Sequence, residues 1–205
     1  MPNQELIDKF ESLLMATKRE GIESLIDYIR KSDFYTAPAS TRFHSCHEGG
    51  LLEHSLNVYD CLVEKKISKI WESEMGNLAD DSLIVVALLH DICKTNYYVV
   101  EMKNRKVYNE LGKKADSNGR YDWESYPGYT VDDKFPYGHG EKSVMMIEQF
   151  IKLSPQERYL IRWHMGFTEP KESWNTLSAA INKYPLIVAI HEADLEATYL
   201  LESEE

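Results

Sequence analysis

The feature that most constrains this chain is an apolar run that ends abruptly in polar and charged residues. Residues 83–89 are all apolar, and His90, Asp91 and, three positions later, Lys94 follow them. The polar triplet 80–82 can cap the start of the run, which predicts a buried helix of about three turns. A buried carboxylate must be paired or bound to a metal. Because successive helical residues point about 100° apart, His90 and Asp91 can both reach one ion beside the helix end. The alternative is a helix C-terminus whose dipole favours nearby cations.

Length and composition bound the fold and the partners. With 205 residues, 43% of them hydrophobic, the chain can bury a core and is expected to form one domain, 1–205. No apolar run approaches the roughly 20 residues of a membrane span, and the N-terminus lacks a signal-peptide pattern. We therefore expect a cytoplasmic protein with no membrane partner. A net charge of −11 disfavours a long nucleic acid as partner but is compatible with a small anion held by a metal and one or two lysines.

Three cysteines, Cys46, Cys61 and Cys93, form no CxxC pair and are odd in number. This pattern is typical of reduced thiols rather than of a disulfide framework. Cys46 with His44 and His47 suggests a zinc site only weakly, because no other part of the chain supplies ligands with a matching spacing.

Helical spacing of apolar residues recurs through most of the chain. Ser154 and Glu157 form a capping box with Pro155 at the first helical position, which is a specific start signal. Two N-terminal helices within 1–40 are amphipathic and carry no evident chemistry. The predicted helices cover residues 3–18, 21–31, 51–66, 83–89, 139–150, 155–166, 177–182 and 185–201.

Residues 96–137 break the helical pattern with an aromatic β insertion. Residues 97–102 and 106–108 predict two strands around a turn at Asn104 and Arg105. Further strands are predicted near 120–124 and 129–132. The insertion is either a surface hairpin packed on its own tyrosines or a flap whose tyrosines cover a bound substrate.

Six histidines and aspartates stand at positions that the helical pattern places in the interior or at helix ends. A single histidine on an apolar face is more often a core residue than a ligand. Together, nitrogen and oxygen donors on separate helices suit Fe, Mn, Co, Ni or Zn. Six donors exceed the four of a structural zinc site, so one or two divalent transition metal ions with open positions are expected. The candidate ligands are His54, His90, Asp91, His139, His164 and Asp194.

Two stretches carry a resemblance to a known family. Residues 49–56, Gly-Gly-Leu-Leu-Glu-His-Ser-Leu, and 88–94, Leu-Leu-His-Asp-Ile-Cys-Lys, resemble the HD superfamily of metal-dependent phosphohydrolases over about residues 40–200. The resemblance implies an all-α HD-domain helical bundle, here with a β-hairpin insertion. The family usually has glycine where Cys93 stands, and the GYP motif of its cyclic-dinucleotide branch is absent.

The added histidines resemble the branch of that family that binds two metals. By this resemblance, His54, His90, Asp91 and Asp194 hold one metal. Asp91 bridges to a second metal, which His139 and His164 hold.

The function implied is hydrolysis of a small phosphate ester, either a nucleotide or a phosphodiester, by a metal-activated hydroxide. Asp91 and Lys94 are the expected catalytic residues, and Lys94, His47 and Lys142 the expected substrate contacts. Two alternatives stay open: a mixed-valent di-iron oxygenase of HD type, and a non-hydrolytic nucleotide-binding regulatory module. The sequence leaves the oligomeric state open.

Overall fold

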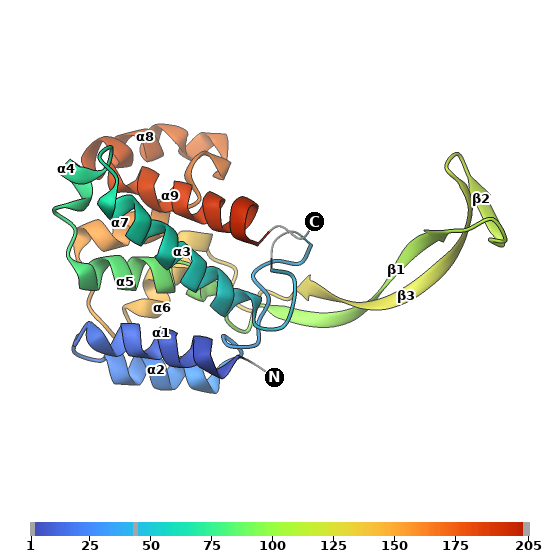
Figure 1. The fold of residues 1–205 in the computed structure, drawn as a ribbon, viewed down its shortest axis with the longest axis horizontal. Coiled ribbons are helices and arrows are strands. Elements are labelled where there is room, and N and C mark those ends of the chain that lie inside the picture. The colour runs from blue at the N-terminus through green and yellow to red at the C-terminus, as the bar shows by residue number, and fades with distance from the viewer. Residues whose placement is uncertain (1–2, 43–44, 203–205) are drawn as a thin grey trace.

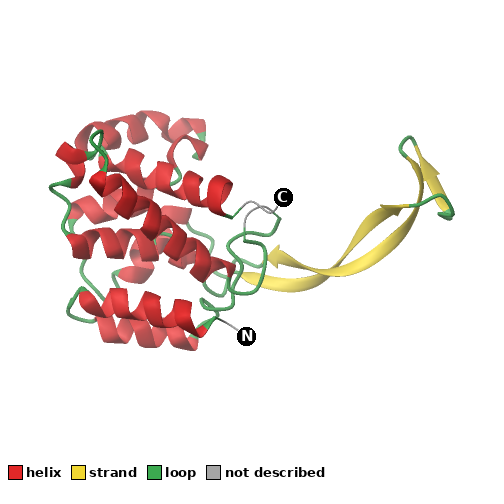
Figure 2. Cartoon of the chain, viewed as in Figure 1, coloured by secondary structure: helices red, strands yellow, loops and turns green. Residues whose placement is uncertain are grey.

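The computed structural model describes residues 3–42 and 45–202, and it consists of a helical body from which a β ribbon projects (Figure 1). Figure 2 shows that the strands are confined to this ribbon. The helices are α1 Gln4–Ala16, α2 Ile22–Lys31, α3 Gly50–Ile67, α4 Glu72–Met75, α5 Asp80–Leu89, α6 His139–Ile147, α7 Pro155–Trp163, α8 Trp174–Lys183 and α9 Leu186–Glu196. Short 3-10 turns lie at η1 Ile92–Lys94, η2 Gly166–Thr168 and η3 Lys171–Ser173, and a π-helical turn, η4, spans Ala197–Leu201.

The fold is therefore mostly helical, as predicted, but the description all-α is too narrow because the insertion forms a small antiparallel sheet. The short helix α4 was not expected, and α8 begins three residues earlier than predicted. His44, one of the weak zinc candidates, lies outside the described residues. Across 3–42 and 45–202, no helix combines the length and apolar character needed to cross a membrane.

The apolar run forms helix α5, and every residue from Leu83 to Leu89 is buried. A helix that is hydrophobic on all sides must be covered on all sides. Helices α1, α3 and α7 pack against it, and α9 packs against α3 and α7. The C-terminal end of α5 consequently opens into the interior of the body, where His90 and Asp91 follow.

Polar contacts fix how the helices meet. The capping box is confirmed: the Glu157 N–H donates to Ser154 Oγ at 3.2 Å, and the Ser154 N–H donates to Glu157 Oε2 at 2.7 Å. The buried Glu157 carboxylate also accepts from Arg19 Nη1 at 3.0 Å, and Arg19 bonds Asp81 at the start of α5. This network ties the α1–α2 loop to α5 and α7.

A close approach between α6 and α7 depends on a glycine. A Cβ atom at Gly140 would lie 2.2 Å from the backbone oxygen of Arg162, so no other residue fits there without movement. The start of α6 and the end of α7 therefore touch. His139 and His164 stand at those two ends, with ring centroids 5.1 Å apart.

The insertion is a twisted ribbon of two long strands. Strand β1, Tyr98–Tyr108, pairs antiparallel with β3, Gly119–Val131, in a register that runs from Tyr98 opposite Val131 to Tyr108 opposite Tyr121. Strand β2, Lys114–Asp116, pairs with the outer end of β3.

The predicted turn at Asn104 and Arg105 is wrong, because β1 continues through both residues. Their polar side chains find partners across the ladder: Ser125 Oγ donates to Asn104 Oδ1 at 2.6 Å, and Arg105 Nε donates to Glu124 at 2.7 Å. A ribbon that is exposed on both faces does not need apolar residues at alternate positions, so a polar pair inside the strand is no signal of a turn.

Candidate metal centre

Two histidines at helix ends have one ring nitrogen fixed by the backbone. His90 Nδ1 lies 2.8 Å from the Ala87 oxygen and His164 Nδ1 lies 2.6 Å from the Ile161 oxygen. A carbonyl oxygen only accepts, so each Nδ1 carries a proton, and the neutral form of each ring presents a lone pair on Nε2. Burial opposes the charged form of His164, but Asp91 outweighs burial and raises the pKa of His164. Both Nε2 atoms are buried and have no hydrogen-bond partner among the described residues. Burial lowers the pKa of His90 to about 4, which keeps it neutral.

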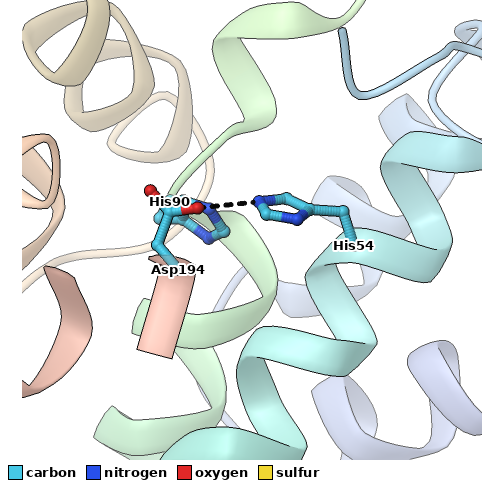
Figure 3. Close-up of side chains that lie close together, drawn as sticks. All are labelled: His54, His90 and Asp194. Atoms are coloured by element: carbon cyan, nitrogen blue, oxygen red, sulfur yellow. Dashed lines mark ion pairs between the residues drawn. The ribbon is translucent and has the colours of Figure 1, made fainter. Parts of the chain in front are cut away.

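His54 approaches from α3 and meets Asp194 on α9. His54 Nε2 lies 3.2 Å from Asp194 Oδ1, and Figure 3 shows His90 beside this pair. Burial alone would lower the pKa of His54, but hydrogen bonds with Asp194 and Glu202 outweigh burial and raise it to about 9. Burial raises the pKa of Asp194, but the hydrogen bond and charge of His54 outweigh burial and hold this pKa well below its usual value. His54 and Asp194 therefore form a buried ion pair in this structure, and His54 would bind a metal through Nε2 only after giving up the proton there.

Asp91 stands at the centre of the cluster and directs its two oxygens to different neighbours. Oδ1 lies 2.7 Å from His139 Nε2 and 3.6 Å from His164 Nε2. Oδ2 lies 2.6 Å from Lys94 Nζ and 3.6 Å from His90 Nε2. Burial disfavours the charged carboxylate, but Lys94, His90 and His139 together hold the pKa of Asp91 well below its ordinary value. Asp91 is thus an anion placed between two sets of donors.

The structure brings all six predicted ligands into overlapping donor groups. Within each group the candidate ligand atoms lie within 4.8 Å of one another. Buried polar atoms without hydrogen bonds are uncommon, and the Nε2 atoms of His90 and His164 are two of them. Imidazole and carboxylate donors in this number fit a divalent transition metal. The groups are His54, His90 and Asp194; His90, Asp91 and His164; and Asp91, Cys93 and His139.

The sequence did not identify Glu202, whose carboxylate contacts His54 Nδ1, the ring nitrogen that does not contact Asp194. His54 Nδ1 lies 3.0 Å from Glu202 Oε1, and the same carboxylate accepts from Ser45 Oγ at 2.8 Å and from Asn57 Nδ2 at 3.0 Å. Burial opposes ionisation, yet these donors lower the pKa of Glu202 to about 2. The π-helical turn η4 ends at Glu202 and sets its position. Nothing in the sequence marks this residue, because glutamates in an acidic C-terminal stretch are usually solvated.

A second supporting residue, His191, lies on α9 three residues before Asp194. Its Nδ1–H donates to the backbone oxygen of His164 at 2.8 Å. Gly166 makes room for the His191 ring, since a Cβ there would lie 2.6 Å from it. His191 therefore steadies the end of α7 from which His164 projects.

Lys94 and Lys142 both line a small cavity of about 60 Å³ beside the cluster, together with Cys93, Tyr97, Asp133, Tyr137 and His139. Asp91 and Tyr98 keep the pKa of Lys94 raised although burial opposes the charge. Lys142 Nζ pairs with Asp133 Oδ1 at 2.7 Å and lies 5.0 Å from the Tyr97 ring centroid. Because Cys93 and His139 line it, this cavity adjoins the cluster.

His47, the third expected substrate contact, lies elsewhere. It is exposed, with Nδ1 3.2 Å from the Glu48 backbone oxygen and Nε2 3.3 Å from Glu53. It does not line the small cavity. A larger cavity of about 630 Å³ lies between α6, α7 and α8, and none of the six candidate ligands lines it. The two cavities share Tyr137.

Comparison with curated proteins finds a partial match to the dihydroneopterin 2',3'-cyclic phosphate phosphodiesterase of Methanocaldococcus jannaschii, 39% identical over 64 residues. The match covers 31% of this chain and 25% of that protein, so the similarity spans about a quarter of its length. No family model matches the chain, and no solved structure matches it. Over one segment, the chain is similar to a phosphodiesterase.

Proposed function

We propose that this chain is a metal-dependent phosphohydrolase of HD type that hydrolyses a small phosphate ester, either a nucleotide or a phosphodiester. The observation that carries the proposal is the pair of buried Nε2 atoms of His90 and His164, which have no hydrogen-bond partner within residues 3–42 and 45–202. They lie 3.6 Å from Asp91 Oδ2 and Oδ1, respectively. The partial similarity to a phosphodiesterase supports the same reaction class.

In this proposal His54, His90, Asp91 and Asp194 hold one divalent metal. Asp91 also serves a second, held by His139 and His164. The ions come from Fe, Mn, Co, Ni or Zn, which imidazole and carboxylate accept. Bound there, they supply Lewis acidity that makes water more acidic and polarises a phosphoryl oxygen.

The remaining steps fall to side chains of this chain. Lys94 stays protonated, lines the small cavity and can donate to a phosphoryl oxygen as negative charge develops there. Its bond to Asp91 Oδ2 keeps the ammonium at the edge of the cluster. Lys142, on the far side of the same cavity, attracts the anionic substrate while Asp133 holds its position. Because Tyr97 also lines that cavity, it limits the size of the group that enters.

The test is a panel of phosphomonoesters and phosphodiesters assayed with Mn, Co, Ni, Mg and Fe, with and without O₂. A phosphohydrolase turns over at least one ester at the same rate in both atmospheres. Turnover that requires O₂ would instead identify the oxygenase. No turnover on the whole panel would favour the regulatory module.

A further inference from the structure

Cys93 faces the cluster from a side that the six candidate ligands leave open. It lies in the short turn η1 and is buried. Its Sγ atom lies 3.3 Å from His139 Nδ1 and 3.9 Å from His139 Nε2. With Asp91 and His139 it forms a donor group of its own, in which one sulfur, one oxygen and one nitrogen lie within 4.8 Å of one another.

The backbone around Cys93 is held in place from α6. The Cys93 N–H donates to Ser143 Oγ at 3.3 Å, and Ser143 is fully buried one turn beyond His139. The turn η1 also packs directly on α6. The backbones at Cys93 and His139 are consequently held relative to each other by the same helix.

An independent observation points to a ligand at this place. His164 Nε2 is fully buried, has no hydrogen-bond partner in the described part of the chain, and lies 3.6 Å from Asp91 Oδ1. The same oxygen lies 2.7 Å from His139 Nε2. A cation held between Asp91 Oδ1 and His139 Nε2 would lie beside Cys93, which shares a donor group with both residues.

We propose that Cys93 is a ligand of the metal in this second position, alongside Asp91, His139 and His164. The proposal rests on the two-metal arrangement described above and adds a sulfur donor to it. On binding, the thiol gives its proton to solvent and the thiolate bonds to the ion. The thiolate and the Asp91 carboxylate then balance the charge of a divalent cation.

A thiolate changes which metals this position prefers. Sulfur with imidazole nitrogen suits Zn, Co and Fe, whereas Mg and Mn prefer oxygen donors. The second position should therefore retain Co or Zn in the presence of excess Mg, and the first position, which has only nitrogen and oxygen donors, should discriminate less.

The experiment uses Co²⁺ as the probe, because a thiolate bound to cobalt gives a charge-transfer absorption band in the near ultraviolet. A Cys46→Ser and Cys61→Ser double variant leaves Cys93 as the sole thiol and serves as the reference. Loaded with Co²⁺, it should show the band. Adding Cys93→Ser should remove the band and weaken binding of the second equivalent at least about tenfold. Elemental analysis counts the cobalt, and circular dichroism confirms that the variants are folded.

Two equivalents of bound cobalt without a band in the sole-thiol variant would overturn the proposal. A band that survives Cys93→Ser would do the same, as would a protein that binds one equivalent and shows no band. The sole-thiol variant decides the matter even if Cys93→Ser fails to fold. Hydrolysis without the sulfur band would overturn this inference and leave the proposed function standing. A sulfur band without any hydrolysis would support Cys93 as a ligand and overturn the proposed function.

Discussion

The helical body and the β ribbon place their polar and aromatic side chains in opposite ways. In the body, histidines and aspartates from distant segments are buried and share a few ångströms of space. In the ribbon, Val100, Met102 and Trp123 are each at least half exposed. The strands project away from the body (Figure 1). The comparison indicates that the candidate ligands come from the helical body and that the ribbon approaches them only at its base.

Distance along the ribbon explains why most of its aromatic residues cannot cover the cavity. Tyr98, at the base, donates to the Ala39 oxygen at 3.2 Å. Tyr121 pairs with Tyr108, ten residues farther along β1, which at about 3.3 Å per residue is roughly 33 Å from the base. The ammonium of Lys106 lies 4.5 Å from the Tyr121 ring centroid and 5.9 Å from that of Trp123. Tyr121 and Trp123 on β3 thus pack around a lysine of the paired strand β1.

The largest effect should come from the body, at His90. We expect His90→Ala to lower kcat/KM by at least about 10³-fold, because metal-ion catalysis supplies several kcal/mol of transition-state stabilisation. Steady-state assays on the best ester of the panel measure this, with circular dichroism to show that the variant is folded. A variant with wild-type kcat/KM would remove His90 from the mechanism.

The next largest effect is on the free energy of unfolding, where breaking an ion pair in the body should matter more than breaking one in the ribbon. Glu157→Gln breaks the buried pair with Arg19 and should lower the free energy of unfolding by about 3 kcal/mol. The exposed ribbon pair of Arg105 and Glu124 provides the control: Glu124→Gln should leave the urea midpoint unchanged. If Glu157→Gln and Glu124→Gln lowered the free energy of unfolding equally, buried ion pairs of the body would not differ in strength from exposed ones of the ribbon.

The buried pair of Arg19 and Glu157 also predicts that the free energy of unfolding depends on pH. Burial raises the pKa of Glu157, but Arg19 and Ser82 outweigh burial and lower it below its ordinary 4.5. A depressed folded-state pKa gives stability that is present above pH 4.5 and lost as the pH falls through the folded value. Wild-type protein should therefore lose more stability than Glu157→Gln as the pH is lowered from 5 towards the pKa of folded Glu157, which urea titrations across that window would measure.

Lys94 tests whether charge at the cavity contributes to the reaction. Lys94→Ala should keep both metals yet lower kcat/KM by about 10²-fold, or about 2.7 kcal/mol of transition-state binding. Lys65 is an equally apt control, because it is also buried and paired, with Glu192 and Glu196 on α9, and does not line the cavity. If Lys65→Ala and Lys94→Ala reduce kcat/KM equally, Lys94 acts through the fold alone.

The smallest effect should come from the outer ribbon. Replacing residues 104–125 with a two-residue Asn-Gly turn keeps the base of the ribbon and removes its tip. Metal content should not change, and kcat/KM for a small phosphate ester should stay within about threefold, since no residue of that range lines the cavity. A change in substrate preference would show that the tip reaches the substrate and would support the interpretation as a flap.

The interior position of several candidate ligands could be predicted from local signals. Because His90 and Asp91 end an apolar helix, both side chains are expected to be buried and to need a partner. The same argument applies to Asp194, which stands inside an apolar helix. Glu202 could not be predicted, because its role depends on a π-helical turn that brings it back to α3. The continuous strand at Asn104 was missed because an exposed ribbon lacks the alternation that marks a half-buried strand.

The central claim is that the buried cluster is a metal centre. Its most direct test is elemental analysis of protein purified without chelator, with the double variant His90→Ala and His164→Ala prepared in the same way. The account predicts one to two equivalents of transition metal in the wild-type protein, a count that follows from its donor groups, and none in the double variant. A wild-type protein that carries no metal and takes up none when Mn, Fe, Co or Zn is added would contradict the account, as would a double variant with undiminished metal.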